Sequence, residues 1–411
     1  MPHRSRLRHA ISARKPLTRE ERHALPKGVK LLALSRTVRW IGWGFGENLI
    51  PILILSFSAS YAEAGLFSSI YEIVLLFALP LVGMLADRAS ARLIVVLGLI
   101  LYPLVGFGYF LAGVTGLAAF VVFARAANGI TWAMDDIGID TYYRRTAGRA
   151  HLASSFGFIE SLAHVGWIAT AVVSIWLARS VPVHVLLLGM VPFSLLAIPF
   201  VLKAPKDKPA RQGVRLSALA SYRHALTEWR RWDGKLRLLG GLAFFMGVLS
   251  TMVGLFIPID AYVSGADLSM VIILGIVGSL PCLLAYPIGR FADGHDKYRL
   301  IAYGLLAGAV VSAALATVPG FGIKLAAAFL FGTLTETFAV AGKYLVTVLG
   351  PEETYGARGS AYESLNTLGN IVAPLLLGVL FDAIGFPGVA TVVAAMALAL
   401  SFSFGLLGSR R

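Results

Sequence analysis

The chain has 411 residues, of which 57% are hydrophobic and only 14% are charged. An ordinary soluble domain carries roughly 25% charged residues, so this composition argues against a water-soluble protein and predicts a membrane protein. The single cysteine, Cys282, excludes an internal disulfide, and the net charge of +14 is spread over the termini, the middle and alternate short loops, which argues against a nucleic-acid partner.

Residues 1–30 form a basic leader without the cleavage site of a signal peptide, so we expect it to be disordered and cytoplasmic. Behind the leader lie apolar segments of about 20 residues or more, the length that crosses a bilayer. We count twelve such segments, at residues 37–58, 63–86, 91–112, 116–140, 152–178, 182–203, 238–261, 269–291, 298–318, 323–347, 360–381 and 386–407.

Lysine and arginine are concentrated in alternate loops between these segments. The loops expected inside carry residues such as Arg88 and Arg145, whereas the loops around residues 58–61 and 264–268 carry none. The positive-inside rule therefore predicts a multi-pass protein of the inner (cytoplasmic) membrane with both termini in the cytoplasm. Residues 204–237 are expected to form a basic cytoplasmic linker, either with an amphipathic helix lying on an anionic leaflet or as an ordinary connection.

Short motifs recur about half a chain apart. The pattern G-x-x-A-D after the second segment, at Gly83 and Asp87, returns at Gly289 and Asp293, and ENLIPIL in the first segment is answered by GLFIPID in the seventh. We therefore predict an all-α polytopic membrane protein. It should have two six-helix bundles, residues 31–203 and 238–407, related by pseudo-two-fold symmetry, and a short cytoplasmic tail at 408–411.

Six plus six segments, a basic central loop and G-x-L-A-D-R after the second segment together resemble the major facilitator superfamily (MFS). The match in that loop comprises Gly83, Leu85, Ala86, Asp87, Arg88 and Arg92. A second family pattern, R-x-x-[QN]-G, is met by Arg125, Asn128 and Gly129 and is associated in the family with proton-coupled members. The G-P-x-x-G-G signature of many antiporters is absent. The resemblance implies the MFS fold, with twelve transmembrane helices, and secondary transport by alternating access.

Ionisable residues inside a membrane cost about 2.5 to 3.5 kcal/mol each on insertion scales and are therefore the main functional candidates. The fourth segment presents a polar stripe at helical spacing from Arg125 to Tyr143. In the family, helices 1, 4, 7 and 10 line the central cavity. The resemblance therefore implies the following substrate-cavity candidates: Trp43, Glu47, Asn128, Trp132, Asp135, Asp136, Glu336 and Lys343.

A buried arginine needs a carboxylate to neutralise it, and Glu47 or Glu72 lies at a compatible depth to pair with Arg125. Burial favours a neutral carboxylate and a nearby arginine favours a charged one, so we interpret the pair as a proton switch, which the family pattern at Arg125 favours; the alternative is a permanent ion pair. His164 is either a relay group or a packing residue. The proton-coupling candidates are Arg125, Glu47, Glu72, Asp136, Glu160 and His164.

The loop after the second segment is expected to act as a conformational latch. Gly83 would let helix 2 approach a neighbour closely, and Asp87 would accept hydrogen bonds from the first amides of helix 11, where the helix dipole is positive. Asp140 is expected to pair with Arg88 or Arg92. The latch candidates are Gly83, Asp87, Arg88, Arg92, Asp140, Gly289 and Asp293.

These features predict a proton-coupled exporter of lipophilic or cationic small molecules. Alternatives on the same fold are uptake of a polar or anionic metabolite and lipid transport, and a non-transporting receptor is a more remote one. The sequence has no catalytic-triad spacing, metal-ligand pair or G-x-x-x-x-G-K-[ST] loop, so we expect no enzyme activity, no cofactor and a proton or ion gradient as energy source. The expected partners are a small-molecule substrate, protons and membrane lipids, with the protein acting as a monomer.

Overall fold

The computed structural model describes residues 25–146, 152–208, 232–284, 288, 291–292, 295–349 and 355–409. Nearly all of the predicted leader and most of the linker, with its possible amphipathic helix, lie outside the described residues. So do the second-half latch candidates Gly289 and Asp293. The last residues of the predicted leader are helical, however, because the first helix begins at Lys27.

The first half of the chain crosses the molecule six times. The passes are formed, in order, by α2 (Lys27–Gly44) with η1 (Glu47–Leu49) and α3 (Ile50–Ser56); α4 (Tyr61–Arg88); α5 (Ala91–Leu101) with α6 (Pro103–Thr115); α7 (Ala118–Thr146); α8 (Leu152–Leu177); and α9 (Val183–Leu186) with η3 (Leu187–Gly189) and α10 (Met190–Lys203).

The second half repeats this pattern. Its passes are α12 (Gly234–Thr251) with the π-helical turn η4 (Met252–Phe256) and α13 (Ile257–Val263); α14 (Leu268–Leu283); α16 (Lys297–Thr317); α17 (Phe321–Val348); and α18 (Tyr355–Ser409). The long run α18 makes two passes because Gly385, with φ of 67°, breaks it in the left-handed region that glycine adopts without strain.

Eight helical runs among the described residues are long and apolar enough to cross a membrane, and the run from Ala361 to Leu407 contains two passes. The first and fourth passes carry several charges, and α14 is short, which is why the count by apolar length is lower than twelve. The prediction of twelve helices in two six-helix bundles is confirmed.

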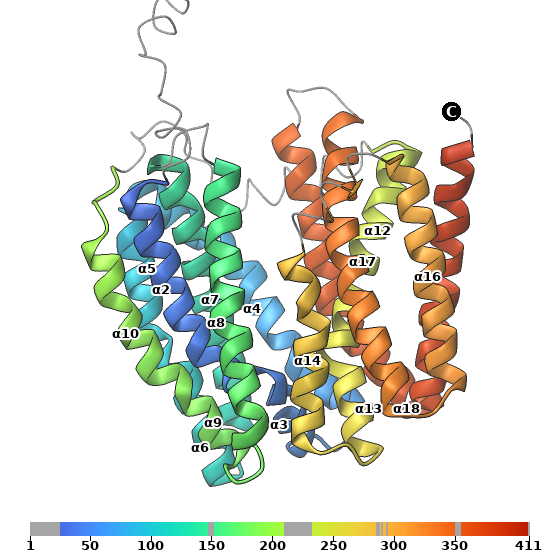
Figure 1. Cartoon of the computed structure of the whole chain (residues 1–411), viewed down its shortest axis with the longest axis horizontal. Coiled ribbons are helices and arrows are strands. Elements are labelled where there is room, and N and C mark those ends of the chain that lie inside the picture. Colours follow the sequence, from blue (N-terminus) through green and yellow to red (C-terminus); the bar gives the residue numbers. More distant parts are fainter. Residues whose placement is uncertain are drawn as a thin grey trace, which may run out of the picture.

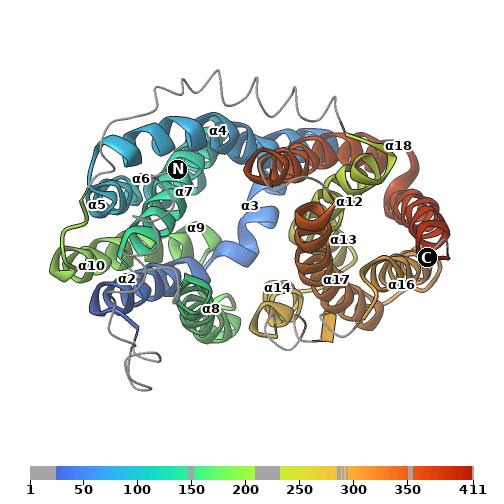
Figure 2. The ribbon, with the colours of Figure 1, turned by 90° about the horizontal axis from the view of Figure 1, so that it is seen from above.

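The two halves form separate bundles that stand side by side (Figure 1). Between them α4 packs against α18, and α8 packs against α14, as the view from above also shows (Figure 2). We call the end of the molecule that carries Lys27, Arg88 and Lys203 the basic end, and the opposite end, with Ser56 and Tyr61, the far end.

Prolines break the first and seventh passes at matching levels. Pro51 cannot continue a regular helix because its ring clashes with the carbonyl of the residue four positions earlier, which is Glu47. The helix α2 ends before Glu47 and restarts as α3 at Ile50. Pro258 follows the π-helical turn η4 in the same way. The two similar sequence segments therefore have similar helix breaks, and Glu47 lies at the break in the first pass.

Hydrogen bonds join the two bundles at the far end. Asp382 accepts from the backbone N–H groups of Tyr61 and Ala62 at the start of α4, both at 2.9 Å, where the helix dipole favours a carboxylate. Ser69 donates to the carbonyl of Ile371 at 2.8 Å. Near these contacts the ring of Tyr61 lies 4.0 Å from the ring of Phe381. The bundles are thus closed against each other at the far end.

The basic end differs at the predicted latch. In the part of the chain that the structure describes, nothing lies within 4 Å of the position that a Cβ of Gly83 would occupy. The prediction that Gly83 brings helix 2 close to a neighbour is therefore wrong for this conformation, in which the bundles meet at the other end of α4. The expected contact of Asp87 with helix 11 involves side chains outside the described residues.

Asp207, at the start of the linker, fixes the basic end of the N-terminal bundle. Its carboxylate accepts from Ser90 Oγ at 2.5 Å, from the Ala91 N–H at 2.9 Å and from Arg145 Nη1 at 2.9 Å. The Arg92 N–H donates to it at 3.2 Å. These bonds tie the loop before α5, the end of α7 and the first residues of the linker together.

Replacement of Asp207 by Asn should lower the melting temperature of the purified protein near neutral pH. Burial opposes ionisation of this carboxyl, but the hydrogen bonds from Ser90, Ala91 and Arg145 outweigh it and lower the pKa of Asp207 below its usual range. A lowered carboxyl pKa adds stability above about pH 4, and this stability is lost as the pH falls through the folded-state value. Melting curves near pH 7 and near pH 3 should therefore show a difference from wild type that shrinks on acidification. An undiminished difference would assign the effect to packing.

Candidate functional site

Five ionisable side chains meet inside the N-terminal bundle, and we call them the charge cluster: Arg36, Arg39, Asp135, Asp136 and Glu160. Arg36 Nη1 lies 3.0 Å from Glu160 Oε1, and its Nη2 lies 3.6 Å from Asp136 Oδ1. Arg39 Nη2 donates to Asp135 Oδ2 at 2.8 Å, and Arg36 Nε lies 3.8 Å from the same oxygen. One network therefore links the first, fourth and fifth passes.

Local sequence explains why these helices approach so closely. Arg36 and Arg39 are three residues apart and so share one face of α2. Gly44 and Gly166 leave no side chain where α2 crosses α8; a Cβ on Gly44 would lie 2.5 Å from the carbonyl oxygen of Trp167, and one on Gly166 would lie 2.8 Å from Thr37 Cγ2. The glycines thus bring the arginine face of α2 against the helices that carry the acids.

The charge cluster contains two guanidinium groups and three carboxylates, so it has one acid in excess. The side chains of Arg36, Arg39 and Asp135 are nearly inaccessible, whereas Asp136 is 48% exposed and Glu160 is 23% exposed. A hollow of about 60 Å³, lined by Arg36, Asp136 and Glu160, lies beside them. The uncompensated acid therefore has access to a proton or a cation from this hollow.

Aromatic rings cover the buried side of the charge cluster. The guanidinium of Arg39 lies 5.1 Å from the ring centres of both Tyr102 and Trp132, a distance at which cation–π attraction operates. Trp40 lies 4.7 Å from the ring of His164, whose Nδ1 is 2.9 Å from the carbonyl oxygen of Glu160. His164 therefore lies beside the charge cluster, and its role as a relay group or a packing residue stays a prediction.

Arg125 does not have the carboxylate partner that the sequence suggested. Its Nη2 donates to the carbonyl of Ser68 at 2.6 Å, and its guanidinium lies 4.9 Å from the ring of Tyr71. Among the described residues no ion pair within 4.0 Å joins it to Glu47 or Glu72. The prediction of such a pair is wrong, because Glu47 is instead bound by Trp167 Nε1, at 2.5 Å, from across the bundle.

Replacement of Arg125 by Ala should still abolish gradient-driven transport while the protein inserts and folds. Arg125 spans from the backbone of α4 to the ring of Tyr71, and lysine, a point charge on a flexible stem, cannot make both contacts at once. We therefore expect Arg125→Lys to lose transport by about tenfold or more as well. Vesicle transport assays with protein amounts matched by fluorescence would measure both; wild-type accumulation by Arg125→Ala would make the residue purely structural.

Asp140 also differs from expectation. It pairs with Arg144 Nε at 2.7 Å, one turn along the same helix, and accepts from the Tyr143 hydroxyl. Arg92 donates instead to the carbonyls of Leu202 and Ala204, at 3.2 and 2.7 Å. The predicted pairing of Asp140 with Arg88 or Arg92 is therefore wrong, because Asp140 is bound by Arg144 and Tyr143 instead. At the basic end, Asp207 forms an ion pair with Arg145 of α7.

The candidates in the C-terminal bundle are separated from one another. Glu336 lies near Cys282, whose Sγ is 3.5 Å from Glu336 Oε1. Lys343 pairs with Glu363 at 2.8 Å, and both side chains are more than half exposed. Glu363 belongs to the eleventh pass, so this pair bridges α17 and α18. The residues Trp43, Trp132 and Asn128 all belong to the N-terminal bundle, where Asn128 is buried.

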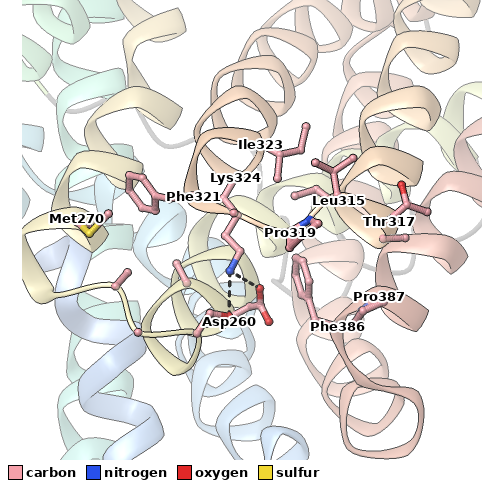
Figure 3. A pocket seen from close by; sticks show the side chains of 17 residues that line it. Asp260, Met270, Leu315, Thr317, Pro319, Phe321, Ile323, Lys324, Phe386 and Pro387 are labelled. Atoms are coloured by element: carbon pink, nitrogen blue, oxygen red, sulfur yellow. Dashed lines mark hydrogen bonds and ion pairs between the residues drawn. The ribbon is translucent and has the colours of Figure 1, made fainter.

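A larger hollow of about 530 Å³ lies at the far end of the C-terminal bundle (Figure 3). Lys324 reaches into it and binds Asp260 at 2.7 Å and Ser264 Oγ at 3.1 Å, while Phe386 and Pro387 form an apolar wall. None of the candidates from the sequence lines this hollow. Its one lysine is neutralised, which explains how a basic residue is accommodated at the far end.

The structure therefore brings together Asp135, Asp136 and Glu160 in the N-terminal bundle, whereas Glu336 and Lys343 belong to the other bundle. Sequence reasoning missed Arg36 and Arg39 as the partners of these acids. A signal was available, because Arg39 lies inside the predicted first segment at 37–58, where any arginine needs a partner.

The sequence model of the Major Facilitator Superfamily matches residues 32–335 of this chain. The chain belongs to the Major Facilitator Superfamily. As an MFS protein it is a multi-pass membrane transporter. This agrees with the two six-helix bundles described above.

Known proteins resemble this MFS transporter over nearly their whole length. It is 21% identical to the quinolone resistance protein NorA of Staphylococcus aureus strain MRSA252, over 87% of this chain and 90% of NorA. It is also 21% identical to multidrug resistance protein 1 of Bacillus subtilis strain 168, over 91% and 95% of the two chains. The crystal structure of the nucleoside transporter NupG superposes with a TM-score of 0.72 at 16% identity, covering 92% of this chain and 98% of NupG, which supports the fold.

Proposed function

We propose that this MFS transporter exports lipophilic cationic small molecules in exchange for protons. The observation that carries the proposal is the excess acid of the charge cluster, which has three carboxylates against two guanidiniums. NorA and multidrug resistance protein 1 are named for drug resistance, and their similarity to this chain supports export over uptake. The basic end faces the cytoplasm in this proposal, as the positive-inside rule favours.

The coupling follows from the cost of an uncompensated charge in a low-dielectric site. Isolated ionised carboxylates are too costly to bury, so the third acid needs either a proton or a cation. Asp136 is the best group for this exchange, because it is the most exposed of the three acids and, unlike Asp135, has no ion pair with Arg39 among the described residues. One proton and one cationic substrate would then compete for a single charge and alternate in occupying it.

The aromatic surroundings suit a lipophilic cation. Trp132 is partly exposed, and its ring lies 6.0 Å from Trp40 and 6.5 Å from Tyr71. Aromatic faces attract organic cations more strongly when water is excluded. With the far end closed by Asp382, substrate would enter from the basic end, which is the cytoplasmic side in this proposal.

Transport by purified protein in sealed proteoliposomes tests this function, with ethidium as the lipophilic cation. An exchanger should accumulate ethidium in vesicles that are acidic inside, because protons leave as the cation enters. A symporter of a polar solute should instead accumulate uridine or xylose when the outside is acidic. Empty vesicles control for passive accumulation. Indifference of ethidium transport to the pH gradient would overturn the coupling.

A further inference from the structure

Nine buried side-chain polar atoms in the N-terminal bundle have no hydrogen-bond partner among the described residues. Six of them are Arg39 Nε and Nη1, Tyr102 OH, Tyr109 OH, Arg125 Nε and Asn128 Oδ1. Each of these six belongs to a residue that is at least nine-tenths buried. Since about nine in ten buried polar groups in proteins are hydrogen-bonded, such a concentration of unpartnered atoms calls for partners that are not protein atoms.

These atoms belong to residues of the first, third and fourth passes. Tyr102 and Tyr109 are seven residues apart, two turns along the third pass, which separates them by about 10 Å. The ring centre of Tyr102 lies 5.1 Å from the guanidinium of Arg39, which donates to Asp135 at 2.8 Å. Both tyrosines belong to one buried cluster that includes Trp167, and Trp167 donates to Glu47.

Aromatic side chains border the Arg39 end of this set of atoms. Trp43 is buried, and its ring lies 6.0 Å from Tyr102 and 6.5 Å from Trp132. The guanidinium of Arg39 lies 5.1 Å from the ring centres of both Tyr102 and Trp132. These rings leave the unpartnered nitrogens of Arg39 in apolar surroundings.

We propose that ordered water completes these hydrogen bonds and forms a proton path from Glu47, past Tyr109 and Tyr102, to Asp135 in the charge cluster. The proposal rests on the proposed proton exchange and adds the route by which the proton arrives. Each water or hydroxyl accepts one proton and passes on another, so one proton moves from the Glu47 carboxyl to the Asp135 carboxylate. Rotation of the hydroxyls and waters then restores the original direction of the hydrogen bonds. Buried water with several polar neighbours is an ordinary structural element of proteins.

The charged and titratable groups that face this path come from four passes. Arg39 and Glu47 lie on the first pass, Arg125 and Asp135 on the fourth, and Glu72 on the second. Trp167 of the fifth pass donates to Glu47 and so orients that end. Tyr102 and Tyr109 are the positioning residues, because they carry hydroxyls at intermediate depths where no acid or base is available.

The test compares Tyr102→Phe and Tyr109→Phe with Tyr362→Phe. Tyr362 is also buried, but it lies in the other bundle and its hydroxyl contacts Met246 Sδ at 3.4 Å. Ethidium accumulation driven by a pH gradient should fall by about tenfold or more in Tyr102→Phe and Tyr109→Phe. Exchange of labelled for unlabelled ethidium without a gradient should stay within about twofold of wild type, since it needs no net proton movement. Tyr362→Phe should be unchanged in both assays.

A second measurement detects the water itself. X-ray radiolysis converts bound water to hydroxyl radicals that label neighbouring side chains, and mass spectrometry then locates the label. Tyr102 and Tyr109 of the wild-type protein should be labelled faster than Tyr362. Equal labelling of all three, or normal gradient-driven accumulation by both variants, would overturn the path while leaving proton exchange intact. Wild-type transport that ignores the gradient would instead overturn the proposed function, and the path with it.

Discussion

Asp136→Asn is expected to suppress the accumulation of ethidium that a pH gradient drives, and to weaken ethidium exchange as well, because the cation loses the carboxylate that it binds. The substitution removes the excess acid of the charge cluster and leaves two guanidiniums facing two carboxylates, a set that is neutral without a proton. Gradient-driven accumulation should fall by about tenfold or more, the range of ordinary coupling free energies. The measurement is ethidium accumulation in proteoliposomes that are acidic inside, beside exchange at equal pH.

Asp140→Asn is the matched control, since the same chemical change is made one turn further along α7. Asp140 is bound by Arg144 and Tyr143 outside the charge cluster, so its neutralisation leaves the excess acid in place. Its pH profile should stay close to that of wild type. If Asp140→Asn lost coupling and Asp136→Asn kept it, the exchange site would have to be reassigned to Asp140 and its neighbours.

Arg39→Met is expected to destabilise the protein more than any other single change considered above. Arg39 is 1% exposed and makes the closest contact to Asp135, which would be left with Arg36 Nε at 3.8 Å. Removing one partner of a buried ion pair costs about 3–5 kcal/mol, because the remaining charge is buried without compensation. Thermal unfolding in detergent and the yield of monodisperse protein would measure the loss.

The double variant Arg39→Met with Asp135→Asn separates charge from packing. A buried ion pair replaced on both sides by neutral groups is often tolerated, so the double variant should recover most of the melting temperature lost by Arg39→Met. No recovery would mean that Arg39 stabilises the bundle through its contacts with Tyr102 and Trp132. Recovered stability without recovered transport would assign the pair to proton exchange.

Most of the fold could be predicted from the sequence, because hydropathy and the loop charges report burial in a membrane directly. The start of the first pass was predicted wrongly. The helix begins at Lys27, ten residues before the predicted segment at 37–58. Its early part includes Arg36, a residue that hydropathy places outside a membrane. Arg36 is tolerated there because acids on two other helices surround it. Such contacts between helices cannot be read from the hydropathy of one segment.

The site was less predictable, for a related reason. Helical spacing placed Asp136 on the polar stripe of α7, yet the acid of this helix that the structure buries most is its neighbour Asp135, while Asp136 is 48% exposed. Spacing within one helix does not say which helices meet. The sequence therefore suggested Glu47 or Glu72 as the partner of Arg125, although Trp167 binds the Glu47 carboxylate. The sequence analysis also overlooked a nearer partner for Asp140, because Arg144 lies one turn away on the same helix and binds it at 2.7 Å.

The anchoring of the linker has a consequence for how far the bundles can move apart. Asp207 fixes one end, and Trp232, buried in the core of the other bundle, fixes the second. Only the 23 residues from 209 to 231 lie outside the described chain between these anchors. Their contour is about 35 Å if wholly helical and about 80 Å if fully extended. The covalent link alone therefore permits the two anchors to separate by at most about 80 Å.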